Sequence, residues 1–415
     1  MSIIKYILDL GATVMLPIII FLLALILGEK PGRAFRSALT IGIGFVGINL
    51  VIGLLVNNLG PAAQAMVEHM GVHLNVIDVG WPASAAIAFA SKVGAFVIPI
   101  GLLVNIIMLA TRLTKTVNVD LWNYWHFAFT GALVTAATGS LTWGLVAAAI
   151  NAAIVLLLAD WTAKMVQDFY GLPGISLPHG FSAAYVPIAI PLNKLIDKIP
   201  VINKIEADTD TINKRFGIFG EPIVIGLILG VVLGILAKYD VKGILNLGIS
   251  MAAVMLLLPR MVRILMEGLI PISEAAKAFM QKRFQGREFY IGLDSAIAVG
   301  HPAAIATALV LVPITILLAI ILPGNHVLPF GDLATIPFMV VMVVPVTKGN
   351  VFRSILIGTI VIGVGLWIAT NVAPLFTQVA AEAAFKFPTG ATEISSICDG
   401  ANPLTWVILQ IMRLF

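Results

Sequence analysis

The sequence predicts an all-α polytopic membrane protein with two inverted repeats of about five transmembrane helices each, carrying re-entrant hairpins and amphipathic interfacial helices. Three observations support this fold class. Hydrophobic residues make up 60% of the chain and charged residues 11%, with a mean hydropathy of +1.03. Apolar stretches long enough to approach a membrane span recur along the chain. Short sequence matches link the two halves at a nearly constant offset.

The composition excludes several classes of protein. A soluble chain is about 45–50% apolar and about 25% charged, so this one cannot cover a water-facing surface as a soluble enzyme, a disordered chain or a nucleic-acid binder would. The net charge of +4 is expected from basic cytoplasmic loops. The single cysteine, Cys398, excludes an intramolecular disulfide and a multi-cysteine metal site. We therefore expect no metal, no cofactor and no nucleic-acid partner.

A spanning helix needs about 20 mainly apolar residues. The first candidate runs from Ala12 to Gly28, and the basic residues Lys30, Arg33 and Arg36 that follow place the N-terminus outside. We predict an uncleaved span rather than a signal peptide, because no small-residue cleavage site follows. Further apolar stretches cover residues 37–59, 94–111, 124–138, 141–159, 217–237, 243–259, 304–322, 333–347 and 354–372. They predict ten to eleven spans in all.

Four shorter pieces are too brief to cross and too apolar for solvated loops: residues 80–91, 172–193, 291–303 and 388–402. Each is rich in Gly, Pro or polar residues, which membrane interiors tolerate only around a cavity. They are predicted to be re-entrant or interfacial segments, and ordinary surface loops are the alternative. The last apolar piece, Pro403 to Phe415, is too short to span alone, so it lies in the interface or begins an incomplete final helix.

The internal repeat is the most informative pattern. Pro17 matches Pro222, the run from Leu39 to Ile43 matches Leu245 to Ile249, and Asp120 matches Asp332, at offsets of 205, 206 and 212 residues. Corresponding loops carry opposite charge loads: residues 61–79 hold no Lys or Arg, whereas residues 260–290 hold six. By the positive-inside rule the second half is inverted, which is a transporter architecture. The first repeat is residues 1–193, the basic cytoplasmic connector 194–216, and the second repeat 217–415.

Several motifs along the chain carry a family resemblance. They are LPIIIFLLALILG, DVGWPAS, VDLWNYWHFAFTGAL, LPHG, FGEP, GLDSAIAVGH, LPFGDLATI and NPLTW. Together they resemble the galactitol-type membrane component, enzyme IIC, of the bacterial phosphoenolpyruvate-dependent sugar phosphotransferase system. The resemblance implies an inner-membrane permease that takes up a polyol and releases its phosphate ester. It also implies that the phosphoryl donor is a cysteine of a separate soluble IIB protein, served by a separate IIA protein.

Related ascorbate-type carriers imply a homodimer in the lipid bilayer with an elevator-like moving core. Three alternatives stay open. They are a secondary polyol or carboxylate transporter without phosphorylation, an ascorbate-type phosphotransferase carrier, and a receptor or structural membrane protein.

Ionisable groups inside a membrane are functional candidates by default. Asp294 and His301 are seven residues apart, on one helix face if the segment is helical, although Gly300 and Pro302 favour a hairpin tip. The alternative is a capping aspartate and a solvated histidine. His126 and Thr130 share a helix face, and the alternative for that run is an aromatic interfacial belt. The substrate site is predicted from Trp81, Ser84, Asn123, His126, Thr130, His179, Asp294, His301, Asp332 and Thr335.

His179 lies in a Pro-interrupted piece, and the matching ascorbate-type position binds substrate. Asp332 and its repeat mate Asp120 have capping of the following spans as their alternative. Phosphoryl transfer to an alcohol needs alignment, charge neutralisation and a path for the leaving proton. We expect His179 to accept that proton, with Asp294 as second choice, because a neutral imidazole is less costly to bury than a carboxylate.

Other candidates are weaker. His69 and His73 lack a matching ligand pair and are predicted to lie on a surface helix. Cys398 is expected to lie outside, beyond the reach of a IIB partner. No phosphate-binding Gly-rich loop with a lysine occurs, so nothing in the sequence favours nucleotide-driven transport.

Overall fold

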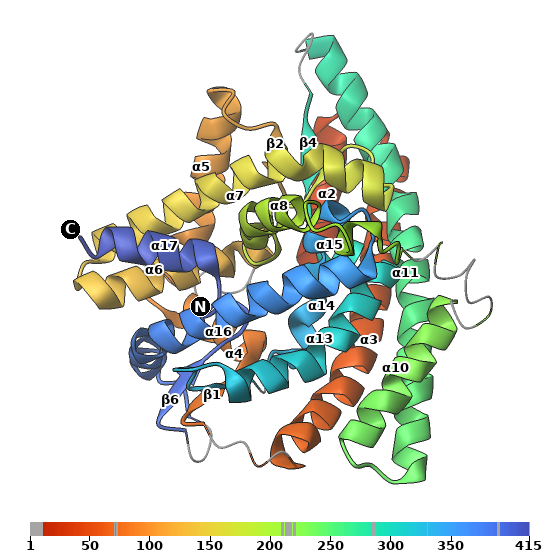
Figure 1. Cartoon of the computed structure of the whole chain (residues 1–415). Helices are drawn as coiled ribbons and strands as arrows, with labels where there is room; N and C mark the ends of the chain where they lie inside the picture. Colours follow the sequence, from red (N-terminus) through yellow and green to blue (C-terminus); the bar gives the residue numbers. More distant parts are fainter. Residues whose placement is uncertain are drawn as a thin grey trace.

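The structure is a computed structural model that describes residues 11–69, 71, 74–208, 211, 218, 221–283, 288–329, 331–387 and 391–414 (Figure 1). The helices of the first half are α2 Gly11–Ile26, α3 Pro31–His69, α4 Gly80–Ala90, α5 Gly94–Ala110, α6 Trp125–Thr138, α7 Leu141–Tyr170 and α8 Val186–Ile196. Those of the second half are α10 Pro222–Leu236, α11 Val241–Arg283, α12 Ala296–Val299, α13 Pro302–Ile321, α14 Ile336–Val340, α15 Val343–Val346, α16 Val351–Glu382 and α17 Pro403–Met412.

Five of the described helices are long and apolar enough to cross a membrane: α3, α7, α11 up to Ile272, α13 and α16. The pair α4 and α5 would add a sixth span, but it is bent by 89° at the break. The other predicted spans coincide with helices of at most 17 residues, and residues 333–347 are broken into several short helices. The lengths of the described helices therefore support fewer full spans than the ten to eleven predicted. The prediction was too high because an apolar sequence does not reveal where a helix breaks.

Six short strands, which an all-α prediction does not include, form two parallel sheets. Strand β1 Val76–Asp78 lies between β5 Val327–Leu328 and β6 Glu393–Ser395. Strand β4 Tyr290–Gly292 lies between β2 Thr116–Asn118 and β3 Ile175–Ser176. Both central strands lead into short helices. Pairing satisfies the backbone groups of these non-helical segments, which buried backbone requires.

The helices form two groups that meet along α3 (Figure 1). In one group, α2 packs on α3, α3 on α11 and α11 on α10. In the other, α6 packs on α7 and α17, and α13 on α16. Contacts of α3 with α13 and with the short helix η5, Leu333–Thr335, join the two groups, and α10 also packs on α13.

The two longest helices, α3 and α11, run antiparallel. A Cβ atom added at Gly44 would lie 2.6 Å from the Cβ of Leu265 and 2.7 Å from its Cα. Farther along, the Ser250 hydroxyl donates to the Asn58 side chain at 3.1 Å. Close approach of helix backbones through small residues is how helices pack in membranes, where no hydrophobic force drives them together.

Candidate functional site

A cavity of about 450 Å³ lies where the two helix groups meet. One wall is α3, which supplies Phe45, Asn49, Ile52, Gly53 and Asn57. The opposite wall is made by the ends of short or broken elements: Trp81, Pro82, Trp122, Asn123, Trp125, His126, His179, Phe181, Asp294, Ala296, Ala334, Thr335, Phe338 and Cys398. Each of the four predicted re-entrant or interfacial pieces contributes at least one residue to this wall. Mostly apolar surface with a few convergent polar groups is typical of a small-molecule site.

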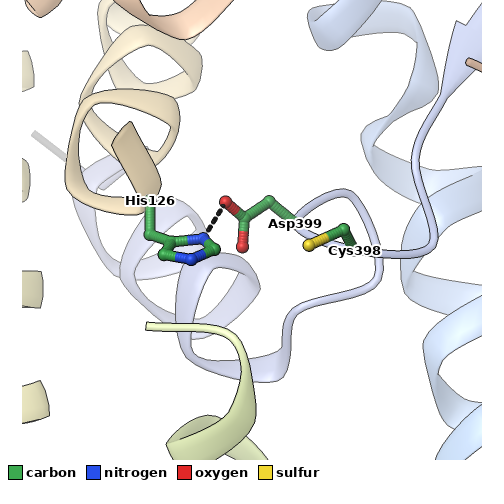
Figure 2. A group of neighbouring side chains, drawn as sticks. All are labelled: His126, Cys398 and Asp399. Carbon is green, nitrogen blue, oxygen red and sulfur yellow. Dashed lines mark hydrogen bonds and ion pairs between the residues drawn. The ribbon is translucent and has the colours of Figure 1, made fainter. Parts of the chain in front are cut away.

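His126, which lines the cavity, forms a buried pair with Asp399 behind it (Figure 2). The Nδ1 atom of His126 lies 2.7 Å from an Asp399 carboxylate oxygen. His126 is at the start of α6, and Asp399 lies 273 residues later in the turn before α17. The Asn402 amide donates to the other Asp399 oxygen at 3.3 Å. The Nε2 atom of His126 is buried and has no hydrogen-bond partner.

His179 and Asp294 form a second pair. The Nε2 atom of His179 lies 3.5 Å from Asp294 Oδ1, and the same oxygen accepts the Ala296 N–H at 2.9 Å. The Nδ1 atom of His179 accepts the backbone N–H of Ser182 at 3.2 Å. Because a backbone N–H must donate, the ring hydrogen of neutral His179 is on Nε2 and points at Asp294. The rings of His126 and His179 are 4.7 Å apart between centroids, so the two pairs are neighbours.

Asn123 extends this polar wall. Its amide donates to Asp120 at 2.7 Å, and Asp120 is buried. Asn123 follows Asp120 by three residues in the turn that leads into α6, so the bond also shapes that turn.

Asp332 lies behind the cavity wall and is held by several donors, two of which belong to the lining residues Trp81 and Cys398. One carboxylate oxygen accepts the Trp81 N–H at 2.7 Å, and the other accepts the Ser396 hydroxyl at 2.6 Å and the Cys398 N–H at 2.9 Å. Its own N–H donates to Asp78 at 2.8 Å. Asp332 thus joins segments that are distant in the sequence. Trp81, for example, precedes it by 251 residues. Its side chain does not cap the short helix that follows it.

Six of the ten predicted site residues line the cavity: Trp81, Asn123, His126, His179, Asp294 and Thr335. The other four do not. Ser84 donates to the Gly80 carbonyl, and Thr130 is hydrogen-bonded to Thr405 and Asn151 beneath the wall. His301 caps the start of α13 and packs against Phe169 and Tyr170. Asp332 has the supporting position described above.

Sequence reasoning missed Asn49, Asn57, Cys398 and Asp399. The two asparagines are in a long apolar helix, where their helical spacing was the only signal. Cys398 was considered only for its side of the membrane, and its place on the cavity wall, where it is buried, was not predicted. Its neighbour Asp399 carried no motif signal, because its partner His126 is remote in sequence.

His126, Cys398 and Asp399 each offer a possible metal ligand, with the three ligand atoms within 4.8 Å of one another (Figure 2). Tetrahedral zinc with ligands at about 2.0–2.3 Å keeps its ligand atoms well over 3 Å apart. The 2.7 Å separation of Nδ1 and the carboxylate oxygen is therefore a hydrogen bond, and the pair would have to separate before both atoms could bind one ion. Among the described residues His69 is on α3, and its predicted companion His73 lies outside them.

Similarity to known proteins covers nearly the whole chain. The family described as "PTS system sugar-specific permease component", EIIC-GAT, matches residues 6–390. The "PTS system galactitol-specific EIIC component" of Escherichia coli strain K12 is 49% identical over 410 residues, which are 99% of this chain and 90% of that protein. The protein of the same name from strain O157:H7 has the same identity and coverage.

A "Putative permease IIC component" of strain K12 is 44% identical over 409 residues, which are 99% of this chain and 93% of that protein. A match of this extent, on a mostly helical fold with several membrane-span-length helices, settles the relationship. The chain therefore belongs to the family of sugar-specific permease components, EIIC, of the bacterial phosphotransferase system.

Proposed function

We propose that the chain translocates galactitol or a similar polyol across the bacterial inner membrane and presents it for phosphorylation by a phosphocysteine of the IIB partner, which IIA recharges. The observation that carries the proposal is the cavity between the two helix groups, in a chain 49% identical to galactitol-specific components. A polyol must exchange its hydrogen bonds with water for bonds with protein. The polar groups that converge on this cavity, inside an otherwise apolar body, offer that exchange.

The cavity lining suits a linear polyol. Trp81, Trp122 and Trp125 offer apolar faces for its C–H groups. Amide, imidazole, hydroxyl and carboxylate groups for its hydroxyls come from Asn49, Asn57, Asn123, His126, Thr335, His179 and Asp294. The described residues that line the cavity include no Lys or Arg. A lining without these cations favours a neutral polyol over an anion such as ascorbate.

His179 and Asp294 are proposed to act on the hydroxyl that becomes phosphorylated. The Nε2–H of His179 can donate to Asp294 or to a substrate oxygen, and Asp294 can accept from a substrate hydroxyl. The bond from Ser182 N–H occupies the only lone pair of neutral His179. This bond speaks against the expectation that His179 itself takes the proton. Within this pair, Asp294 is the group that can accept a hydrogen bond from the substrate hydroxyl.

The two halves are proposed to be inverted repeats, residues 1–193 and 217–415, joined by the connector. Two features support this. The central strand of each sheet comes from one half and both edge strands from the other, since β1 pairs with β5 and β6 while β4 pairs with β2 and β3. The antiparallel helices α3 and α11 also contain the matching runs 39–43 and 245–249. Mates that run antiparallel are expected of inverted repeats.

An elevator-like movement is proposed as the transport step. One wall of the substrate cavity is on α3, and the other is on the helix group that contains α6, α7, α13, α16 and α17. Sliding of that group along α3 would carry a bound polyol with it, which is the rigid-body motion expected of inverted-repeat transporters. The same proposal includes a homodimer in the lipid bilayer, with the dimer contact formed by the helix group of α2, α3, α10 and α11.

Proteoliposomes that contain the purified chain test the proposal. With phosphorylated IIB present, radiolabelled galactitol should appear on the IIB side as its phosphate ester, and without IIB no accumulation should occur. Accumulation of free galactitol driven by an ion gradient would instead identify a secondary transporter. Ascorbate in place of galactitol tests the ascorbate-type alternative, and an absence of transport and ester with every substrate would indicate a receptor or structural protein.

A further inference from the structure

The two histidines of the cavity differ in which nitrogen is free. Asp399 is fully buried, accepts at one oxygen from Asn402, and faces His126 Nδ1 with the other oxygen. A carboxylate accepts, so the ring hydrogen of His126 is on Nδ1 and the lone pair is on Nε2. In His179 the Nδ1 atom accepts the hydrogen bond from Ser182 N–H, so the ring hydrogen is on Nε2 and the lone pair is already occupied. Of the two histidines, His126 is the one whose neutral form presents a free basic nitrogen.

The Nε2 atom of His126 needs a donor. It is buried without a hydrogen-bond partner, on a residue that lines the cavity and is 1% exposed. Buried polar atoms nearly always have a partner, and exceptions in native structures often mark a catalytic role. Figure 2 shows this nitrogen on the edge of the ring away from Asp399. Because His126 lines the cavity, a hydroxyl group of a bound polyol would be its donor once a local shift opens this nitrogen to the cavity.

The ring of His126 is fixed from two sides. A Cβ atom at Gly180 would lie 2.6 Å from the His126 Cβ and 2.9 Å from its Cγ, so only glycine leaves room for the imidazole. Asn402 donates to the Gly180 carbonyl at 3.0 Å as well as to Asp399. The same amide thus holds both the residue behind the ring and the carboxylate that orients it. Such support is what a base with a defined tautomer requires.

We propose that His126 is the proton acceptor of the phosphoryl transfer and that Asp399 is its positioning residue. This inference deepens the proposed function and rests on it. The polyol oxygen forms a bond to phosphorus while the sulfur–phosphorus bond of the IIB phosphocysteine breaks and its electron pair stays on the departing thiolate. The hydroxyl proton moves to Nε2 of His126. The imidazolium formed is stabilised by Asp399, and its proton returns to solvent or to the thiolate.

Asp294 is the competing acceptor. Its Oδ1 is already approached by two donors, the Ala296 N–H and His179 Nε2–H. An oxygen that already faces two donors is less available to a substrate proton than a ring nitrogen that has no hydrogen-bond partner. An imidazole is also better matched to proton transfer near neutral pH. Asp294 and His179 therefore orient the hydroxyl, and His126 takes the proton.

The test compares His126→Gln, Asp399→Asn and their double variant in proteoliposomes with phosphorylated IIB. For each protein, equilibrium galactitol binding and the rate of ester formation are measured separately. His126→Gln keeps an amide near the Nε2 position but cannot take a proton, so we expect affinity within a few-fold of wild type and a rate lower by roughly 10²- to 10⁴-fold. Asp399→Asn should lower the rate with unchanged affinity, and it should add nothing in the His126→Gln background.

Controls separate this inference from the proposed function. His326→Gln, at an exposed histidine that does not line the cavity, should leave both measurements unchanged. If His126→Gln does not fold, Gly180→Ala displaces the same ring and should also reduce the rate more than the affinity. A normal rate in His126→Gln, or an equal loss of rate and affinity, overturns the assignment. Wild-type protein that binds galactitol but forms no ester contradicts group translocation and, with it, this role of His126.

Discussion

Buried carboxylates in this protein differ in how many donors surround them. Asp332 accepts from two backbone N–H groups and one hydroxyl, and it is 0% exposed. Asp294 lines the cavity and keeps 17% of its side chain exposed. Both were predicted as site residues from their polar character inside apolar sequence. The sequence shows that these aspartates lie in apolar stretches, where a carboxylate is costly to bury. Whether the carboxylate is structural or faces the substrate depends on its hydrogen-bond donors. These come from distant segments, as with Ser396, which is 64 residues from Asp332.

Asp332→Asn is expected to destabilise the fold. An amide in place of the carboxylate would direct an NH₂ group at one of the donors that now bind Asp332, and leaving such a buried donor unsatisfied costs roughly 1–3 kcal/mol. The melting temperature of the detergent-solubilised protein should therefore fall, whereas Asp294→Asn should melt near wild type. A normal melting temperature combined with lost galactitol binding would show instead that Asp332 contacts the substrate.

Trp81→Ala should weaken galactitol binding. Trp81 is at the start of α4 on the cavity wall, and removal of an aromatic face that packs on substrate C–H groups costs about 0.5–1.5 kcal/mol beyond the loss of buried area. Equilibrium binding should therefore weaken by roughly tenfold, with a smaller effect on the rate of phosphorylation at saturating galactitol. Trp161→Ala, at a tryptophan that is 57% exposed on α7, is the matched control. Unchanged binding in Trp81→Ala would place the polyol elsewhere.

At the scale of elements, every predicted apolar stretch that lies within the described residues coincides with a helix. Hydrophobic runs report burial in protein or lipid directly. The lengths of the helices were not predictable from these runs. α3 continues through Pro61 to His69 as one helix, whereas residues 333–347 are divided between η5, α14 and α15. The six strands were also missed. Each has only two or three residues, and its partners belong to the other half of the chain.

Gly44→Ala should disrupt the packing of α3 on α11. The added methyl group would meet the Cα and Cβ atoms of Leu265 within 2.7 Å, and a helix backbone cannot move aside as a flexible side chain can. We expect overpacking of about 1–3 kcal/mol and a lower melting temperature. Gly363→Ala is the matched helical control, because nothing lies within 4 Å of the Cβ position there. Equal melting temperatures of the two variants would contradict the close approach of the helices.

At the scale of the whole molecule, the cavity exists only because the two halves are interleaved. α3 belongs to the first half and Asp294 and Cys398 to the second, and each sheet combines strands of both. The offset matches and the loop charges in the sequence predict two related halves of opposite orientation. They carry no information on how the halves interlock, because pairing between short strands depends on backbone geometry rather than on side-chain pattern.

The orientation of the halves makes a prediction for membrane topology. Arg33 precedes the part of α3 where Ser37 and Ile41 contact Gly268 of α11, so the basic residues Arg33 and Arg263 belong to the same end of the antiparallel pair. By the positive-inside rule this end is cytoplasmic. Cysteine substitutions at exposed Arg33 and Arg263 should therefore react with a membrane-impermeant maleimide in inverted vesicles.

Cysteines at exposed Glu68 and Lys238, toward the opposite end, should instead react in right-side-out vesicles. The native thiol provides the blank, since Cys398 is buried. Because α3 and α11 carry matching sequence and run antiparallel in the structure, an inverted arrangement is expected to put residues 33 and 263 on one side of the membrane and 68 and 238 on the other. Labelling of residues 33 and 263 from opposite sides would rule out the inverted repeat and, with it, the proposed elevator movement.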